Sequence, residues 1–398
     1  MFNFKTFGAT FIIAGSTIGA GMLGLPVVMG LFGLIPGIIM MFLVWAFMLS
    51  TAFMLLEANS WFKEEESVNL ISLAHVTMGR LGSIIVWATY GFLFYSLMVA
   101  YIIKGGDLLF ILIGKNVEIF SKTEASYLFV ACLSFFIVWR GAKVVDIFNQ
   151  IFMFGLMVAY ITLIWAIAPF MDYSLLDDLH SNNYVFLVPF IIIAFGFHNM
   201  IPSIFDYLNR DVSQTKKAII YGSLIPMVLY IIWIVVALGV LDYNEVAKGF
   251  SENKIATELM SDIGASIVIS TGALVFSFFA ILTSLLGQGL SLRDFLIDGF
   301  SLLNINLSKF IASALCIFPA LFFSYTWPQI FFECLQIAGG IAATVLFGIL
   351  PPIILLQGRY KFNKTGSYRF CFNKKGLYSI ALLSTMIFVY QSYLIFIK

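Results

Sequence analysis

Residues 15–26 of this chain read GSTIGAGMLGLP, and they interrupt an apolar stretch that runs from Phe7 to Met29. About 20 apolar residues suffice to cross a bilayer as a helix, so the stretch is long enough for one span. It nevertheless holds four glycines and a proline within twelve positions. Glycine in a helix interior costs about 1 kcal/mol relative to alanine, and unwound backbone at membrane depth persists only where it is buried in protein or lines a cavity. The stretch therefore predicts a discontinuous helix whose freed backbone groups bind a ligand.

A second apolar segment, Val185–Tyr207, is interrupted by FGFHNMIPS at residues 195–203. Two interrupted spans in corresponding positions of two halves indicate a secondary transporter with its site near the bilayer midplane.

The composition is that of a polytopic membrane protein. The chain is 61% hydrophobic and 11% charged, with a mean hydropathy of +1.00, whereas soluble domains are about 25% charged. We expect a single transmembrane domain over residues 1–398, with the lipid bilayer as its surroundings. The net charge of +1 gives no reason to expect nucleic acid as a partner. The four cysteines lie far apart, which indicates neither a metal site nor a disulfide framework.

Apolar windows of about 19 residues predict eleven spans. Their approximate limits are 7–29, 33–57, 83–103, 125–140, 144–168, 185–207, 217–241, 265–290, 308–326, 329–356 and 376–397. With the N-terminus in the cytoplasm, sixteen of the 22 lysines and arginines fall on the cytoplasmic side, as the positive-inside rule requires. Eleven spans then place the C-terminus in the periplasm.

Three segments near the span ends carry further expectations. The third span continues past Lys104 to Ile113, as one long helix or as a helix plus a short surface piece. Apolar residues at helical spacing predict an amphipathic cytoplasmic helix over residues 69–82. Residues 244–262 mix charge with apolar residues and predict an outer helix that caps the entrance.

An ionisable side chain inside the membrane is a functional candidate because burying it requires a partner or a cavity. His198 lies in the middle of the sixth span beside the break. It is either a functional histidine or one that only hydrogen-bonds a freed carbonyl. Thr283 and Ser284 in the eighth span, like Ser16 and Thr17 at the first break, carry hydroxyls that ordinarily bond back to the preceding turn. Together with carbonyls near Gly15 and Ile18, Thr283 and Ser284 also offer the oxygen ligands of a small hard cation.

Charged residues near the span ends have simpler explanations. Lys104 and Asp107 are three residues apart on one helix, so an ion pair between them is expected. A bridge from Lys104 to Glu333 would make an outer gate. Six further charged residues lie at span ends, where we expect their side chains to extend to the membrane surface. They are Glu57, Asp146, Asp206, Arg293, Asp294 and Asp298. The chain shows no P-loop, zinc-type cluster or nucleophile elbow, so we expect neither an enzyme nor a bound cofactor or metal.

The two break motifs resemble those of the bacterial aromatic amino acid permeases, the tryptophan- and tyrosine-specific transporters of the hydroxy/aromatic amino acid permease family. Further matches are Ala100-Tyr101-Ile102 leading into Gly105-Gly106, Thr283-Ser284-Leu285-Leu286-Gly287, and Ile349-Leu350-Pro351. The resemblance covers essentially the whole chain. Departures from the family pattern are Gly24, the pair Asn199 and Met200, and Lys104.

This resemblance implies a leucine-transporter-type fold with two inverted repeats, about 5–168 and 184–356, and an extra helix at about 376–397. It implies a substrate site at the two breaks, formed by Ser16, Thr17, Gly19, Ala20, Gly21, Tyr101, Phe195, Gly196, Phe197 and His198. It also matches Gly15, Ile18, Thr283 and Ser284 to a sodium-type site, although bacterial members of the family are generally regarded as proton symporters.

The expected function is ion-coupled uptake of tyrosine or tryptophan across the bacterial inner membrane, with protons favoured over sodium. The alternatives are a sodium-coupled transporter, a carrier of hydroxy or branched-chain amino acids with the same fold, and a non-transporting membrane sensor. A channel is a weaker alternative because the sequence has no filter-like repeat.

Overall fold

The computed structural model describes residues 4–62, 69–114, 123–177, 183–262, 267–301 and 304–396, and within these ranges it is helical without a strand. Nine of the described helices are long and apolar enough to cross a membrane, and the bent pair α1–α2 makes a tenth. The prediction of an all-helical, polytopic membrane protein is confirmed. The count of eleven stays a prediction, because α5 (Thr123–Arg140), the expected fourth span, is not among these ten.

The first span is broken where the glycine-rich sequence predicts it. Helix α1 (Phe4–Thr17) ends inside the motif, and α2 (Gly21–Gly30) starts four residues later with its axis bent by 58°. Three residues, Ile18 to Ala20, form the break. Helix α2 is almost entirely buried, whereas α1 buries one face and exposes Phe4, Phe7 and Phe11 on the other.

The sixth span is broken as well. A 3₁₀ turn (Tyr184–Leu187) leads into α7 (Val188–Ala194), and after a second 3₁₀ turn (His198–Met200) the chain continues as α8 (Ile201–Tyr207). Each half-helix has a proline in its first turn, where the missing N–H would have no helical partner in any case. The short halves therefore begin at positions that the sequence defines locally.

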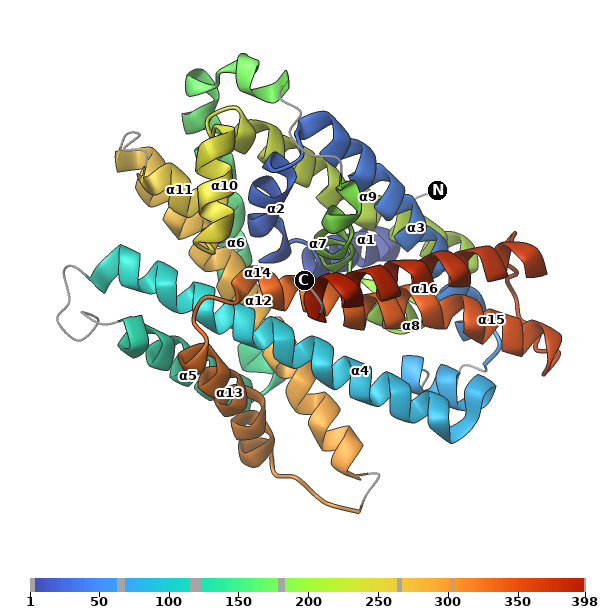
Figure 1. Cartoon of the computed structure of the whole chain (residues 1–398). Coiled ribbons are helices and arrows are strands. Elements are labelled where there is room, and N and C mark those ends of the chain that lie inside the picture. The colour runs from blue at the N-terminus through green and yellow to red at the C-terminus, as the bar shows by residue number, and fades with distance from the viewer. Residues whose placement is uncertain are drawn as a thin grey trace.

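Helix α4 (Leu70–Leu109) tests two expectations about the third span. A separate helix before the span is confirmed: it starts at the Asn69 cap and ends at a kink at Gly79, where the backbone is not helical (φ +70°, ψ −159°) and beyond which the helix of the span begins. The helix then runs without interruption past Lys104 into a π turn (Phe110–Gly114), so the first of the two alternatives, one long helix, is correct. Figure 1 shows α4 crossing the whole molecule.

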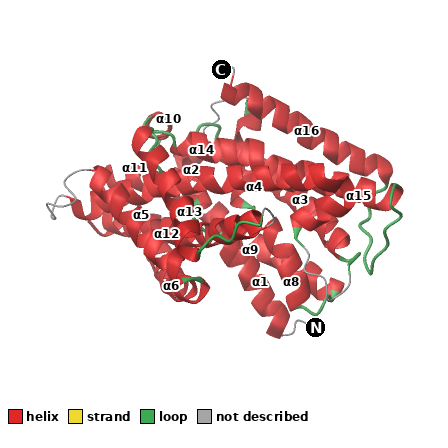
Figure 2. Ribbon diagram, turned by 90° about the horizontal axis from the view of Figure 1, so that it is seen from below, coloured by secondary structure: helices red, strands yellow, loops and turns green. Residues whose placement is uncertain are grey.

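The remaining helices complete the bundle, which Figure 2 shows from a second side. Helix α12 packs along α6 and α4, while α1 packs mainly on α9. The predicted outer segment forms two short helices, α10 and α11, rather than one. The bounds are α3 (Leu34–Asn59), α6 (Ala142–Ile167), α9 (Val212–Leu238), α10 (Tyr243–Ser251), α11 (Ala256–Asp262), α12 (Ile267–Ser301), α13 (Lys309–Thr326) and α16 (Lys374–Phe396), with 3₁₀ turns at Ala168–Phe170 and Tyr173–Asp177.

The tenth expected span changes its winding in the middle. It consists of α14 (Phe331–Ile337), a π-helix (Ala338–Ile349) and α15 (Leu350–Tyr360). A Cβ at Gly339 would lie 2.0 Å from the carbonyl oxygen of Pro189. Because only glycine permits this approach, the π-helix packs directly on the backbone of α7, next to the second break.

Glu57 and Arg293 do not extend to the membrane surface as expected. Glu57 is 2% exposed and forms a two-point ion pair with Arg359, in which Nε lies 2.7 Å from Oε1. Arg293 is 4% exposed and donates to the carbonyl of Val138 at 2.5 Å. Both charges have partners within the protein, which is the condition for burying them. The other residues of that group, Asp146, Asp206, Asp294 and Asp298, are exposed.

Candidate functional site

The first break lies against α12. The backbone N–H of Ala20 donates to the hydroxyl oxygen of Ser284 at 2.8 Å, which satisfies an amide that has left the helix. A Cβ added to Gly19 would lie 2.2 Å from the same oxygen. The glycine therefore makes room for the hydroxyl that accepts from the amide of Ala20.

The two breaks also lie against each other. A Cβ on Gly21 would lie 3.3 Å from the Cα of Ala194, the last residue of α7. Tyr230 of α9 joins them, because its hydroxyl is 2.7 Å from the carbonyl oxygen of Thr17 and 3.1 Å from that of Ala194. These carbonyls end α1 and α7, and the C-terminal end of a helix carries partial negative charge. The fully buried Tyr230 hydroxyl is thus the hydrogen-bond donor shared by the ends of two converging helices.

The other hydroxyls at the first break and in α12 follow the ordinary pattern. Ser16 and Thr17 both donate to the carbonyl of Ile13, at 2.8 and 2.7 Å, and Thr283 donates to that of Ala280 at 3.0 Å. Ser16 is exposed, whereas Thr17 and Thr283 are buried. Of the expected sodium-type group, the structure brings Ser284 to the break. The ion-binding role of Gly15, Ile18, Thr283 and Ser284 stays a prediction.

His198 is enclosed at the second break. Its ring is 1% exposed and stacks between Phe197, at 5.1 Å between centroids, and Phe347 of the π-helix, at 4.7 Å. Its Nε2 lies 2.9 Å from the hydroxyl of Thr51 in α3. In the tautomer in which Nε2 carries the hydrogen, the Thr51 hydroxyl accepts it and donates its own hydrogen to the carbonyl of Met48, 3.1 Å away. The remaining nitrogen, Nδ1, is then a bare acceptor, buried without a hydrogen-bond partner in the described part of the chain.

The aromatic candidates are buried around these contacts. Phe195 is fully buried and meets the Tyr230 ring at an angle of 60°, with 5.6 Å between centroids. Tyr101 of α4 is 4% exposed. Gly196 follows Phe195 at the turn itself, where a Cβ would be 3.2 Å from the carbonyl oxygen of Ile193. The residues named by the second motif therefore form one packed cluster with α3, α9 and the π-helix.

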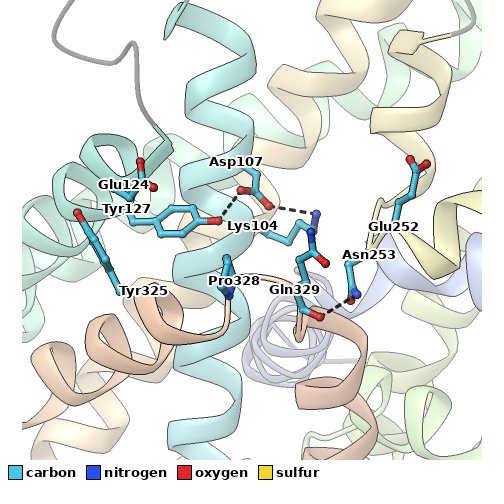
Figure 3. Close-up of a pocket in the computed structure, with 9 residues that line it drawn as sticks. All are labelled: Lys104, Asp107, Glu124, Tyr127, Glu252, Asn253, Tyr325, Pro328 and Gln329. Atoms are coloured by element: carbon cyan, nitrogen blue, oxygen red, sulfur yellow. Dashed lines mark hydrogen bonds and ion pairs between the residues drawn. The ribbon is translucent and has the colours of Figure 1, made fainter.

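A polar cavity of about 320 Å³ lies at the far end of α4 (Figure 3). Its wall holds Lys104, which is only 2% exposed. The ammonium group lies 2.9 Å from Glu258 and 3.3 Å from Asp107. The expected pair with Asp107 is confirmed, and Asp107 also accepts from the Tyr127 hydroxyl at 2.8 Å. The full lining is Lys104, Asp107, Glu124, Tyr127, Glu252, Asn253, Tyr325, Pro328 and Gln329.

The structure changes the expected outer gate. Lys104 pairs with Glu258 of α11, whereas Glu333, in the first turn of α14, is exposed. Asn253 adds a second tie, because its amide donates to the carbonyl of Gln329 and its oxygen accepts from the N–H of Phe332. The α10–α11 pair is thereby fastened to α4 and to the start of α14. A gating role for these contacts stays a prediction.

Sequence reasoning missed Tyr230, Thr51, Phe347 and Glu258. No local motif marks them, and Tyr230 is one of 17 tyrosines. The only available signal was for Glu258, which lies in the segment expected to cap the outer entrance.

Membrane-length helices with two broken spans that touch each other define a multi-pass membrane transporter. The chain belongs to the tryptophan/tyrosine permease family, which is matched over residues 3–391. The members of this family are permeases, that is, transporters and not enzymes.

Named relatives cover most of the chain. A tyrosine-specific transport system 2 of Haemophilus influenzae is 29% identical over 93% of this chain and 91% of its own length. A tryptophan-specific transport protein of the same organism is 28% identical over 91% and 89%. A glutamine transporter 2 of Aliivibrio fischeri is 30% identical over 73% and 75%.

The contact between Gly19 and Ser284 predicts a non-additive pair of mutations. Gly19→Ala pushes the Ser284 hydroxyl away from Ala20, so it removes the same hydrogen bond as Ser284→Ala, a loss of about 1 kcal/mol. We expect each single variant to lower uptake and the double variant to be no worse than the poorer single one. Initial rates of uptake at matched surface expression measure this. Gly287→Ala, on the same helix but with open space around its Cβ, is the control; strictly additive losses would contradict the proposed contact.

The position of Tyr230 predicts a defect at the junction of the breaks. Tyr230→Phe keeps the ring but leaves the Thr17 and Ala194 carbonyls without their donor, which costs about 1–3 kcal/mol when such groups stay buried. We expect kcat/KM for uptake to fall about tenfold or more, since each 1.4 kcal/mol is tenfold. The control is Tyr160→Phe, which removes a hydroxyl bonded to the carbonyl of Leu229. Equal effects of the two substitutions would reduce Tyr230 to a packing residue.

Proposed function

We propose that this permease is an ion-coupled symporter that imports an aromatic amino acid, tyrosine or tryptophan, across the bacterial inner membrane. The observation that carries the proposal is the junction of the two broken spans at Tyr230 in a chain of the tryptophan/tyrosine permease family. The names of the two Haemophilus relatives support the aromatic substrate.

The junction has the chemistry that an amino acid needs. The converging C-terminal ends of α1 and α7 offer carbonyl oxygens and partial negative charge, which suit an ammonium group. The N-terminal end of α2 offers amides and partial positive charge, which suit a carboxylate. Phe195, Phe197 and Tyr101 supply aromatic surface beside them. We assign the backbone around Gly19, Ala20 and Gly21 to the substrate's polar groups, and place Ser16, Thr17, Gly196 and His198 in the same site.

The proposal includes the arrangement of the chain. Two inverted repeats, about 5–168 and 184–356, would each begin with a broken span, and the helix at about 376–397 would lie outside them. The broken first and sixth positions support this arrangement. The proposal has the N-terminus in the cytoplasm and the C-terminus in the periplasm, which the distribution of lysine and arginine supports.

We propose a proton rather than sodium as the coupling ion. His198 is a histidine at membrane depth whose Nδ1 has an unused lone pair, so it can accept a proton without first losing its bond to Thr51. In the sodium alternative, Ser284 and Thr283 act with the carbonyls of Gly15 and Ile18. The observed bond from Ala20 to Ser284 supports a structural role for that hydroxyl.

Uptake into proteoliposomes tests the function. We expect labelled tyrosine or tryptophan to accumulate when an inward proton gradient is imposed, and a proton carrier to abolish accumulation even while a sodium gradient is maintained. The twenty amino acids serve as competitors. Among them, glutamine is the substrate named for the Aliivibrio relative, serine represents the hydroxy amino acids, and leucine represents the branched-chain amino acids. Sodium-driven uptake that disappears in the Thr283→Ala/Ser284→Ala variant would establish the sodium alternative, and absence of any counterflow would leave only the sensor.

Replacing His198 separates its two roles. His198→Ala removes both the ring between the two phenyl groups and the bond to Thr51, so we expect a sharp loss of uptake. His198→Gln retains a donor for Thr51 but cannot carry the proton. We expect it to restore substrate counterflow, which needs no gradient, without restoring proton-driven accumulation. Full proton-driven uptake by His198→Gln would exclude His198 as the carrier.

A further inference from the structure

The connection between α15 and α16 is a long loop with a one-sided charge. Residues 361–373 have no regular secondary structure, and the last 65 residues of the chain hold seven lysines and arginines but no acidic residue. Both flanking helices are candidate membrane spans. The loop therefore lies at one face of the membrane, at the edge of the bundle in Figure 2.

The loop is held in place by the buried ion pair of Glu57 and Arg359. Phe370 donates its N–H to Glu57 at 2.6 Å, and its carbonyl accepts from Arg359 at 2.8 Å. Arg359 also donates to the carbonyl of Phe372 at 2.5 Å. The clamp fixes the backbone of the loop to the end of α3, so its charges are presented in a fixed arrangement rather than on a flexible tether.

Five basic side chains lie on the loop and at the start of α16. All five side chains are exposed, and none has an ion-pair partner in the described part of the chain; they are Lys361, Lys364, Arg369, Lys374 and Lys375. Exposed aromatic rings accompany them, because Lys361 lies 5.3 Å from the centre of the Phe362 ring and Lys374 lies 5.5 Å from that of Tyr360. Basic residues next to aromatic rings at a span end are typical of contact with the headgroup region.

We propose that this basic loop, residues 361–375, is a binding surface for the headgroups of anionic phospholipids. The charge is complementary, the neighbouring spans hold the loop at the bilayer surface, and the Glu57–Arg359 clamp keeps five cations together without a competing carboxylate. If these cations only set the orientation of the chain in the membrane, they would not need to be free of ion pairs or held on one fixed loop. The inference does not depend on the transported substrate or on the coupling ion.

Lipid binding to the purified full-length protein tests the proposal. The melting temperature in detergent is measured while phosphatidylglycerol is added, with phosphatidylcholine of the same acyl chains as the neutral probe. We expect phosphatidylglycerol to stabilise the protein more than phosphatidylcholine does. In the triple variant Lys361→Gln/Lys364→Gln/Arg369→Gln, phosphatidylglycerol should stabilise the protein no more than phosphatidylcholine does at the concentrations that saturate the wild type. The phosphatidylglycerol concentration that gives half-maximal stabilisation should rise tenfold or more, since each basic residue near a lipid surface contributes about a fivefold factor in affinity.

The matched control removes the same charge from three other exposed positions. Arg80→Gln/Lys143→Gln/Lys309→Gln should keep the wild-type preference for phosphatidylglycerol, because these residues lie on separate segments. Equal loss in both triple variants would show attraction by overall charge and overturn the proposal. If inorganic phosphate stabilised the protein as much as phosphatidylglycerol does, the loop would bind a soluble anion, and the lipid proposal would be overturned as well. Lys374→Gln/Lys375→Gln, measured by the lipid retained in native mass spectrometry, gives a second readout, in which unchanged retention also counts against the loop.

Discussion

The structure depends on one constraint: backbone groups that leave a helix inside a membrane must find partners in the protein. The first break meets it through side chains from two other helices, Ser284 for the amide of Ala20 and Tyr230 for the carbonyl of Thr17. The same tyrosine serves the carbonyl of Ala194, so the two breaks are satisfied at one point. Because each partner is a hydroxyl on a neighbouring helix, a movement of α1 relative to α9 or α12, or of α7 relative to α9, would break these bonds. At the substrate site proposed above, the ammonium and carboxylate groups of an amino acid would replace them.

The same constraint applies to the charges that the bundle encloses. Lys104 is buried with Glu258 and Asp107, and Arg359 with Glu57. Breaking such a pair leaves an uncompensated buried charge, which costs several kcal/mol. The two pairs connect segments far apart in sequence: α4 to α11 beside the polar cavity, and α15 to α3 beside the basic loop. They therefore hold the peripheral segments against the helices that surround the broken spans.

His198 shows how the second break differs from the first. Its ring is held by stacking and by one hydroxyl, with one nitrogen left over, so the site has spare hydrogen-bonding capacity. Such buried unsatisfied atoms are uncommon in folded proteins, and each calls for an explanation. The proton that we propose as the coupling ion would provide one for Nδ1.

The sequence by itself determined the membrane class, the position of both breaks and most of the span limits, because these follow from apolar length and from glycine and proline, which act locally. It also identified Lys104 with Asp107, which are three residues apart on one helix. Only the tertiary structure decided which side chains complete the breaks. Tyr230 is 213 residues from Thr17, Ser284 is 264 from Ala20, and Thr51 is 147 from His198. The same holds for Glu258 and for the burial of Glu57. A lone hydroxyl or carboxylate in an apolar span carries no local signal of its partner, since the partner is set by how the helices pack.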